Sequence, residues 1–231
     1  MYGSYFLGYG GGSWTLFLFA AILFASYAQM KVSSAYNRYS RISNGTGYTG
    51  AQIARMILDR NGLHHVRIET TPGRLTDHYD PRERVLRLSA PIYNGSSVAS
   101  MSVAAHEAGH AIQHDRGYFM LVLRNNLAPI VGLGARFVWL FIILGFLVSP
   151  FLADIGIALF LGVVIFQIVT LPVEFDASRR ALVQLENGIS PRDRMHASRD
   201  MLNAAALTYV ASTLVAIGQL LRLLAITNRR R

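Results

Sequence analysis

Long uninterrupted apolar runs are the feature that most limits how this chain can fold. Two of them, FVWLFIILGFLVSPFLA and IGIALFLGVVIFQIVTLPV, follow one another between Phe137 and Val173 without a lysine or an arginine. A third, WTLFLFAAILFASYAQM, runs from Trp14 to Met30. A helix of about 20 apolar residues crosses the hydrocarbon core of a bilayer. The runs therefore predict an integral membrane protein, in agreement with an apolar share of 52% and a charged share of only 15%.

The basic residues predict how these runs are oriented. Lys31 is the first charged residue and the only lysine, and its place after the first run argues against a cleaved signal peptide. By the positive-inside rule, the amino terminus lies outside and the chain enters the cytoplasm after Met30. Arginines flank the paired runs, whereas none lies in the connection between them. We therefore expect a transmembrane hairpin with its turn outside, in the inner membrane of a bacterial cell.

A last apolar stretch, from Leu202 to Thr227, leaves two alternatives open. It is long enough for a fourth span, but a crossing would place the basic tail Arg229 to Arg231 outside, against the charge rule. Arg222 would also have to extend to an interface. The other reading is a re-entrant or surface-lying helix. The predicted organisation is an amino-terminal tip and first span (1–30), a cytoplasmic domain (31–128), a transmembrane hairpin (129–173), a cytoplasmic helical segment (174–201) and an apolar helix with a basic tail (202–231).

Local signals predict the opening of the cytoplasmic segment. Thr49 and Gln52 have the spacing of a capping box at the start of a helix, and Gly62 suits the position just after its end. The β-rich runs Val66 to Thr70 and Arg84 to Ser89 are separated by turn residues and predict a hairpin. The second run either offers its edge to an extended peptide or is an ordinary covered strand.

The stretch HEAGH, from His106 to His110, is the strongest candidate for chemistry. It lies in a predicted helix from about Ser97 to Asp115, where residues four apart are about 40° apart around the axis and about 6 Å along it. His106 and His110 can therefore approach one ion, with Glu107 beside it. In the H-E-x-x-H pattern the histidines bind Zn²⁺ and the glutamate is the general base of a peptidase.

A hydrolytic zinc site needs a third protein ligand. The chain has no cysteine, so the ligand is a histidine or a carboxylate. The metzincin extension is excluded because Gln113 and Arg116 stand where it requires glycine and histidine. Only two glutamates follow His110: Glu174, just after the third span, and Glu186. Since the orientation above puts Glu174 on the same side of the bilayer as the histidines, it is the preferred ligand and Glu186 the reserve.

These residues resemble the YugP-like membrane zinc metallopeptidases and, more distantly, the HtpX and CAAX-prenyl-protease group. The resemblance rests on LTDHYDPRERVLRLSAPIYNGSSVASMSVAAHEAGHAIQH, LPVEFDASRRAL and LNAAALTYVA, and it spans nearly all of the chain. It implies a zincin-like, cytoplasm-facing catalytic domain, within an α+β and mostly helical membrane protein, and proteolysis of proteins or peptides, membrane proteins among them. In the distant group the third ligand opens an E-x-x-x-D segment. Here EFDAS has Ser178 in place of the final aspartate, so Asp176 becomes a candidate for orienting a histidine.

Several other residues have open roles. His114 shares the helix face of the two histidines but lies about 12 Å from His106 along the axis, too far to bind the same ion. A donor that stabilises the oxyanion is expected downstream, and the sequence does not choose among three candidates. These candidates are His196, Arg199 and Tyr209.

Two further functions compete with proteolysis. The first is a membrane scaffold or regulatory protein in which the zinc site is structural. The second is a membrane-anchored nucleic-acid binder, suggested by the net charge of +9. The arginines cluster beside apolar segments instead of interleaving with aromatic residues, so we expect the lipid bilayer as their partner and no nucleic acid.

Overall fold

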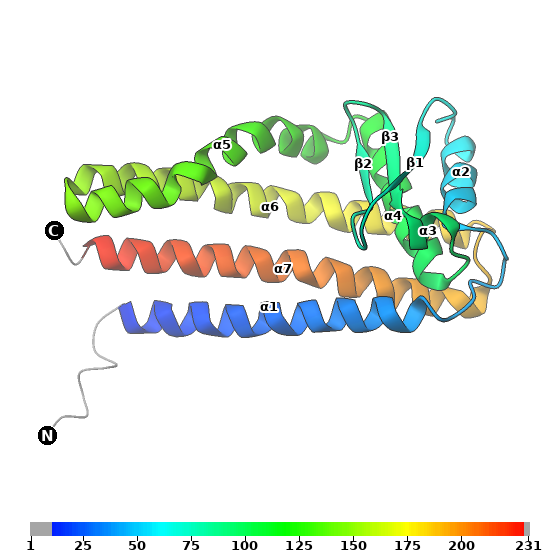
Figure 1. The fold of residues 1–231 in the computed structure, drawn as a ribbon, viewed down its shortest axis with the longest axis horizontal. Helices are drawn as coiled ribbons and strands as arrows, with labels where there is room; N and C mark the ends of the chain where they lie inside the picture. Colours follow the sequence, from blue (N-terminus) through cyan, green and yellow to red (C-terminus); the bar gives the residue numbers. More distant parts are fainter. Residues whose placement is uncertain (1–10, 229–231) are drawn as a thin grey trace, which may run out of the picture. The chain divides into compact units, whose positions relative to one another are not determined.

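The computed structural model describes residues 11–228, so the amino-terminal tip before Gly11 and the basic tail after Asn228 lie outside the described residues. The fold is mostly helical with one small sheet (Figure 1). The elements in chain order are α1 (Gly11–Tyr39), α2 (Gly50–Arg60), β1 (Arg67–Thr71), β2 (His78–Asp80), β3 (Val85–Ser89), α3 (Ala90–Asn94), α4 (Val98–Asp115), α5 (Phe119–Leu147), α6 (Pro150–Glu186) and α7 (Arg192–Asn228).

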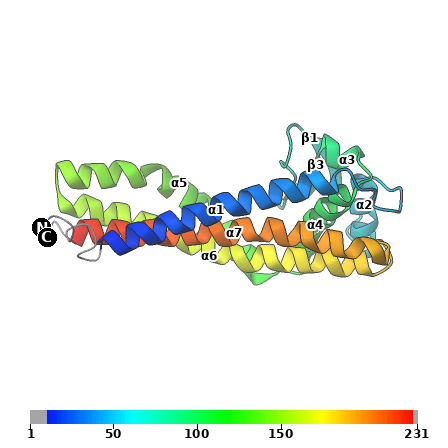
Figure 2. The same cartoon turned by 90° about the horizontal axis from the view of Figure 1, so that it is seen from below.

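Four helices, α1, α5, α6 and α7, are long and apolar enough to cross a membrane. The chain divides into two compact units, the first made of residues up to 28, 123–171 and those from 208 onward. In this first unit α1 and α7 run side by side (Figures 1 and 2). At Gly218 of α7 a Cβ atom would come within 3.2 Å of the Leu18 backbone, so the last helix packs closely on the apolar run of α1.

The second unit, residues 29–122 and 172–207, contains the sheet and the helix with the HEAGH stretch. Its core joins α1, α2, α4, α6 and α7 through fully buried side chains such as Ile53, Leu86, Met101 and Leu185. The predicted capping box is confirmed, because the Thr49 hydroxyl and the Gln52 side chain each accept the other's backbone N–H. Gly62 adopts a φ of 75°, the left-handed conformation that favours glycine after a helix end.

The predicted hairpin between the two longer β runs is wrong. The sheet order is β1-β3-β2, and β1 pairs with β3 in parallel, with Ile68 opposite Leu86. The antiparallel partner of β3 is β2, where Tyr79 lies opposite Leu86. Because β2 has only three residues, it left no readable alternation in the sequence. β3 is therefore the central, covered strand, and the alternative in which it offers a free edge is excluded.

Helix α4 passes through the middle of the second unit, as its composition requires. The Ser97 hydroxyl caps its start by accepting the backbone N–H of Ser100 at 3.0 Å. Small and apolar residues then bury almost every face of the helix, which is typical of a central helix. Alanine and glycine allow neighbouring helices to come close: at Gly109, a Cβ atom would lie 2.6 Å from the Ala177 carbonyl oxygen of α6.

Candidate metal centre

Three side chains from two helices meet where α4 and α6 cross. His106 and His110 lie one turn apart on α4, and Glu174 lies on α6, in the part of that helix that belongs to the second unit. The Oε2 atom of Glu174 is 3.3 Å from Nε2 of His106 and 3.6 Å from Nε2 of His110. Among residues 11–228, these three side chains form the one group of histidines and carboxylates close enough together to hold a metal ion.

The spacing of these atoms suits a zinc ion. Tetrahedral zinc with bonds of about 2.0–2.2 Å keeps its ligand atoms roughly 3.3–3.6 Å apart. The two distances from the Glu174 oxygen fall in that range. The imidazole rings stand edge to face with centroids 4.8 Å apart, so both Nε2 atoms can face a common point. Two imidazoles and one carboxylate are also a donor set that zinc peptidases use.

Gln113 fixes which nitrogen of His110 is available. Its Nε2 donates to the Val173 carbonyl oxygen at 2.8 Å and to Asp176 Oδ2 at 2.9 Å. The amide oxygen of Gln113 therefore faces Nδ1 of His110, at 3.0 Å, and accepts its proton. With Nδ1 of His110 turned to Gln113, Nε2 is the ring nitrogen that faces Glu174 and is available to a metal ion.

The segment after Glu174 supports the rest of the group. The Ser178 hydroxyl lies 3.2 Å from Nδ1 of His106, which leaves the Nε2 atom of that ring facing Glu174. Asp176 is held by Arg179 and Arg180, each at 2.5 Å, and it contacts His110 only through Gln113. The candidate role of Asp176 in orienting a histidine is thus carried through the Gln113 amide.

Glu107 is buried beside the two histidines on α4. Burial raises the pKa of Glu107 to about 7. The charge of His106 and a hydrogen bond from the Tyr79 backbone act in the opposite direction and lower this pKa, but their effect is smaller. A carboxyl group with a pKa near neutrality can both accept and return a proton. A dication bound nearby would lower this pKa again, because it favours the charged carboxylate.

The edge strand β2 brings Tyr79 to the same helix. Its hydroxyl is 2.9 Å from Nδ1 of His114, so His114 contacts the sheet and is half-buried. Burial raises the pKa of the Tyr79 hydroxyl to about 12 and lowers the pKa of His114. The preceding Asp77 anchors β2 to β3 by accepting the backbone N–H of Ser89 at 2.7 Å.

Other residues named from the sequence lie elsewhere. The reserve ligand Glu186 is exposed and forms an ion pair with Arg199 at 3.0 Å. His196 is exposed, and Tyr209 belongs to the first unit.

Gln113 was assigned no role in the candidate metal centre from the sequence. A signal was present, because a glutamine three residues after His110 shares its helix face in an otherwise apolar stretch.

Comparison with known proteins identifies the family. Residues 14–228 match the model of a family described as "Putative neutral zinc metallopeptidase". The chain belongs to this family. Among curated relatives, "Putative membrane protease YugP" of Bacillus subtilis (strain 168) is 45% identical over 212 residues, covering 90% of this chain and 94% of the relative. The resemblance to the YugP-like family found in the sequence is thereby confirmed, and no solved structure matches the chain.

Proposed function

We propose that this protein is a membrane zinc endopeptidase whose site faces the cytoplasm. The proposal rests mainly on the position of the Glu174 carboxylate, which lies 3.3 Å from Nε2 of His106 and 3.6 Å from Nε2 of His110. The Nδ1 atom of each histidine is hydrogen-bonded to another side chain, so Nε2 is the nitrogen that faces the carboxylate. The family and the curated relative support proteolysis, since their names describe a zinc metallopeptidase and a membrane protease.

Each residue has a distinct proposed role. His106, His110 and Glu174 hold zinc, which when bound supplies the Lewis acidity that activates a water molecule and polarises the scissile carbonyl. Glu107 accepts the proton of that water at its carboxylate and delivers a proton to the leaving amine. Glu107 suits this role because it lies one residue after His106 on α4 and is buried beside the proposed ligands. The substrate is a protein or peptide at or near the membrane surface.

A cleavage assay tests the proposed activity. The full-length protein in proteoliposomes is mixed with a labelled unfolded protein and with a lipid-tethered peptide, before and after treatment with a zinc chelator. We expect chelation to stop cleavage and added zinc to restore it. Stoichiometric zinc binding without cleavage of either substrate would instead support a scaffold with a structural zinc site.

Replacing Gln113 with leucine is expected to weaken zinc binding. The change removes the acceptor for the His110 proton and the donors to Val173 and Asp176, and partners of this kind are typically worth about 10- to 100-fold in metal affinity. Competition with a chromogenic chelator measures the affinity, and Gln184→Leu, at a half-buried position on α6 outside the group of ligands, is the matched control. Affinity equal to that of the control would show that Gln113 does not orient His110.

The absence of cysteine makes the orientation directly testable. Val148 lies in the turn between α5 and α6, and Arg82 is exposed between β2 and β3. A membrane-impermeant thiol reagent added to intact cells should label Val148→Cys, and should label Arg82→Cys only after permeabilisation. Since α7 packs on the apolar run of α1, we also expect Asn228→Cys to be labelled from outside. Labelling of Arg82→Cys in intact cells would contradict the cytoplasmic site.

A further inference from the structure

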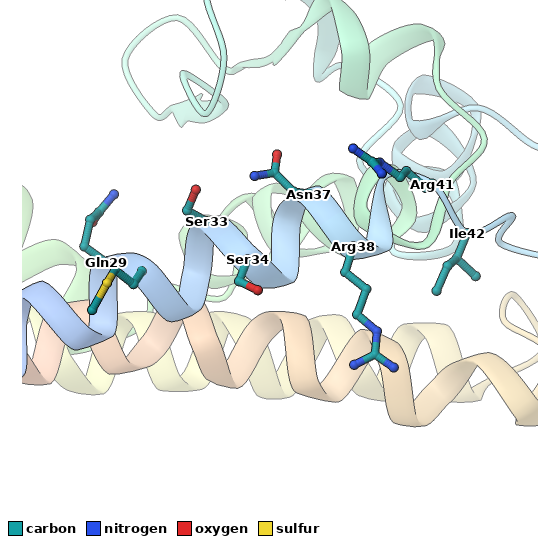
Figure 3. A pocket seen from close by; sticks show the side chains of 8 residues that line it. Gln29, Ser33, Ser34, Asn37, Arg38, Arg41 and Ile42 are labelled. Atoms are coloured by element: carbon teal, nitrogen blue, oxygen red, sulfur yellow. The ribbon is translucent and has the colours of Figure 1, made fainter.

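The second unit has a polar groove on the outer surface of α1, away from the candidate metal centre. The groove has a volume of about 910 Å³ and follows α1 from Gln29 to Ile42. Figure 3 shows its two edges, one formed by Gln29, Ser33, Asn37 and Arg41 and the other by side chains that include Arg38. Each edge repeats every four residues, so the groove is the furrow between two ridges of one helix.

Positive charge gathers at this groove without matching carboxylates. Arg38 and Arg41 line the groove and Arg74 contacts its edge; all three are exposed, and none of them forms an ion pair within residues 11–228. Arg74 comes from the turn between β1 and β2, and its Nη2 donates to the Asn37 side-chain oxygen at 3.3 Å. Residues distant in sequence thus bring their charges to one surface, which favours an anionic partner.

One carboxylate, that of Asp200, contacts this part of α1 and is hydrogen-bonded there. Asp200 accepts a hydrogen bond from the Tyr39 hydroxyl at 2.7 Å, on the buried side of the helix. Arg38 lies over the Tyr39 ring, 5.5 Å from its centroid, which orients the side chain but does not neutralise its charge. Asn37 and Arg41 point to one side of α1 and Arg38 to the other, so two guanidinium groups border the groove (Figure 3).

The position of the groove along α1, close to the end of its apolar run, indicates what kind of anion it binds. The apolar run of the same helix ends at Met30, and one lysine follows at once. At a rise of 1.5 Å per residue, Ser34 lies about 6 Å beyond Met30, Arg38 about 12 Å and Arg41 about 16 Å. The amino-terminal half of the groove, from Gln29 to Ser34, therefore lies in the interfacial layer, which is roughly 5–8 Å thick on each side of a bilayer, and the two arginines follow within the next two turns.

We propose that this groove binds the headgroup of an anionic phospholipid. Arg38 and Arg41 hold its phosphate, and the hydroxyl and amide groups of Ser33, Ser34 and Asn37 hydrogen-bond to the glycerol or to a second polar headgroup. The inference needs α1 to cross the membrane but does not depend on proteolysis. Its consequence is a fixed height of the second unit above the lipid, because Tyr36 and Tyr39 of the same helix segment belong to the core that also contains α4.

Native mass spectrometry of the full-length protein tests this site. The protein is released from micelles containing phosphatidylglycerol and phosphatidylcholine in equal amounts, and the lipids retained on it are counted. A basic residue near a lipid surface contributes about fivefold to binding, so the double variant Arg38→Gln/Arg41→Gln is expected to retain phosphatidylglycerol roughly 25-fold less well. Phosphatidylcholine retention should not change.

The matched control removes the same charge elsewhere in the unit. Arg82 and Arg116 are exposed outside the groove, so Arg82→Gln/Arg116→Gln should retain phosphatidylglycerol like the wild type. Equal retention by both double variants and the wild type, or an equal loss in both variants, would overturn the proposal. Displacement of the lipid by millimolar inorganic phosphate would show a site for free phosphate instead. Displacement by an acidic peptide would show a protein-binding surface.

Discussion

Replacing Glu107 with glutamine is expected to abolish peptide-bond cleavage and to leave zinc bound. Glutamine has the same shape and can still accept the Tyr79 backbone hydrogen bond, but it cannot take a proton from water. General acid–base catalysis typically contributes about 10²- to 10⁴-fold, so the cleavage rate should fall by at least that factor. Turnover of a labelled substrate and zinc content per protein molecule are the two measurements.

A matched glutamate variant controls for the loss of a carboxylate. Glu186→Gln removes an exposed carboxylate that pairs with Arg199, and it should cleave like the wild type. If Glu107→Gln also cleaved at the wild-type rate, Glu107 would not be the general base and the peptidase mechanism would fail. If Glu107→Gln lost its zinc, the rate alone would no longer report on proton transfer.

The pH dependence of stability gives Glu107 a second readout in zinc-free protein. Burial raises its folded-state pKa to about 7, above its ordinary value, so folding favours the protonated form. The stabilising contribution of the protonated group is complete below its unfolded-state pKa and is lost as the pH rises through about 7. Zinc-free Glu107→Gln should therefore gain in Tm over the wild type between pH 5 and pH 8. A constant Tm difference would contradict the burial of an ionisable group there.

Replacing Glu174 with alanine is expected to lower zinc affinity by more than the roughly 10- to 100-fold that outer-shell partners contribute. The change removes the oxygen that lies within 3.6 Å of both Nε2 atoms. His106→Ala and His110→Ala should cause losses of the same order, because each removes one of three ligands. Competition titration with a chelator measures all three variants.

The reserve ligand provides the control for this series. Glu186→Ala should bind zinc like the wild type, since Glu186 is exposed and paired with Arg199. Wild-type affinity in Glu174→Ala, or a loss in Glu186→Ala that matches the histidine variants, would show that a different carboxylate completes the site. Circular dichroism of each variant distinguishes loss of a ligand from loss of the fold.

The parts of the structure that sequence reasoning predicted are those set by local chemistry. Helix α4 could be predicted because Ser97 caps it and small apolar residues continue for several turns. Glu174 could be placed near the histidines because the orientation expected from the charge asymmetry puts it on their side of the bilayer, and only two glutamates follow His110. Both predictions use information contained in one segment or in the order of segments along the chain.

The parts that were missed depend on packing between distant segments. The parallel pairing of β1 with β3 was missed because the strand that lies between them in the sequence, β2, has only three residues and carries no periodic signal. The link from Gln113 to Asp176 joins residues 63 positions apart, and the Ser178–His106 contact spans 72 positions. Such contacts arise only when α4 and α6 cross, and the small residues around Gly109 indicate that another helix can come close without indicating which one.

X-ray absorption at the zinc edge tests the central claim most directly. For zinc-loaded wild-type protein in lipid, we expect two imidazole nitrogens and one protein carboxylate oxygen at about 2.0–2.2 Å from the metal. In Glu174→Ala, the carboxylate contribution should disappear while the imidazole scattering of His106 and His110 remains in the residual bound fraction. An unchanged spectrum in Glu174→Ala, or a wild-type spectrum with no carboxylate oxygen, would contradict a metal site completed by the α6 carboxylate.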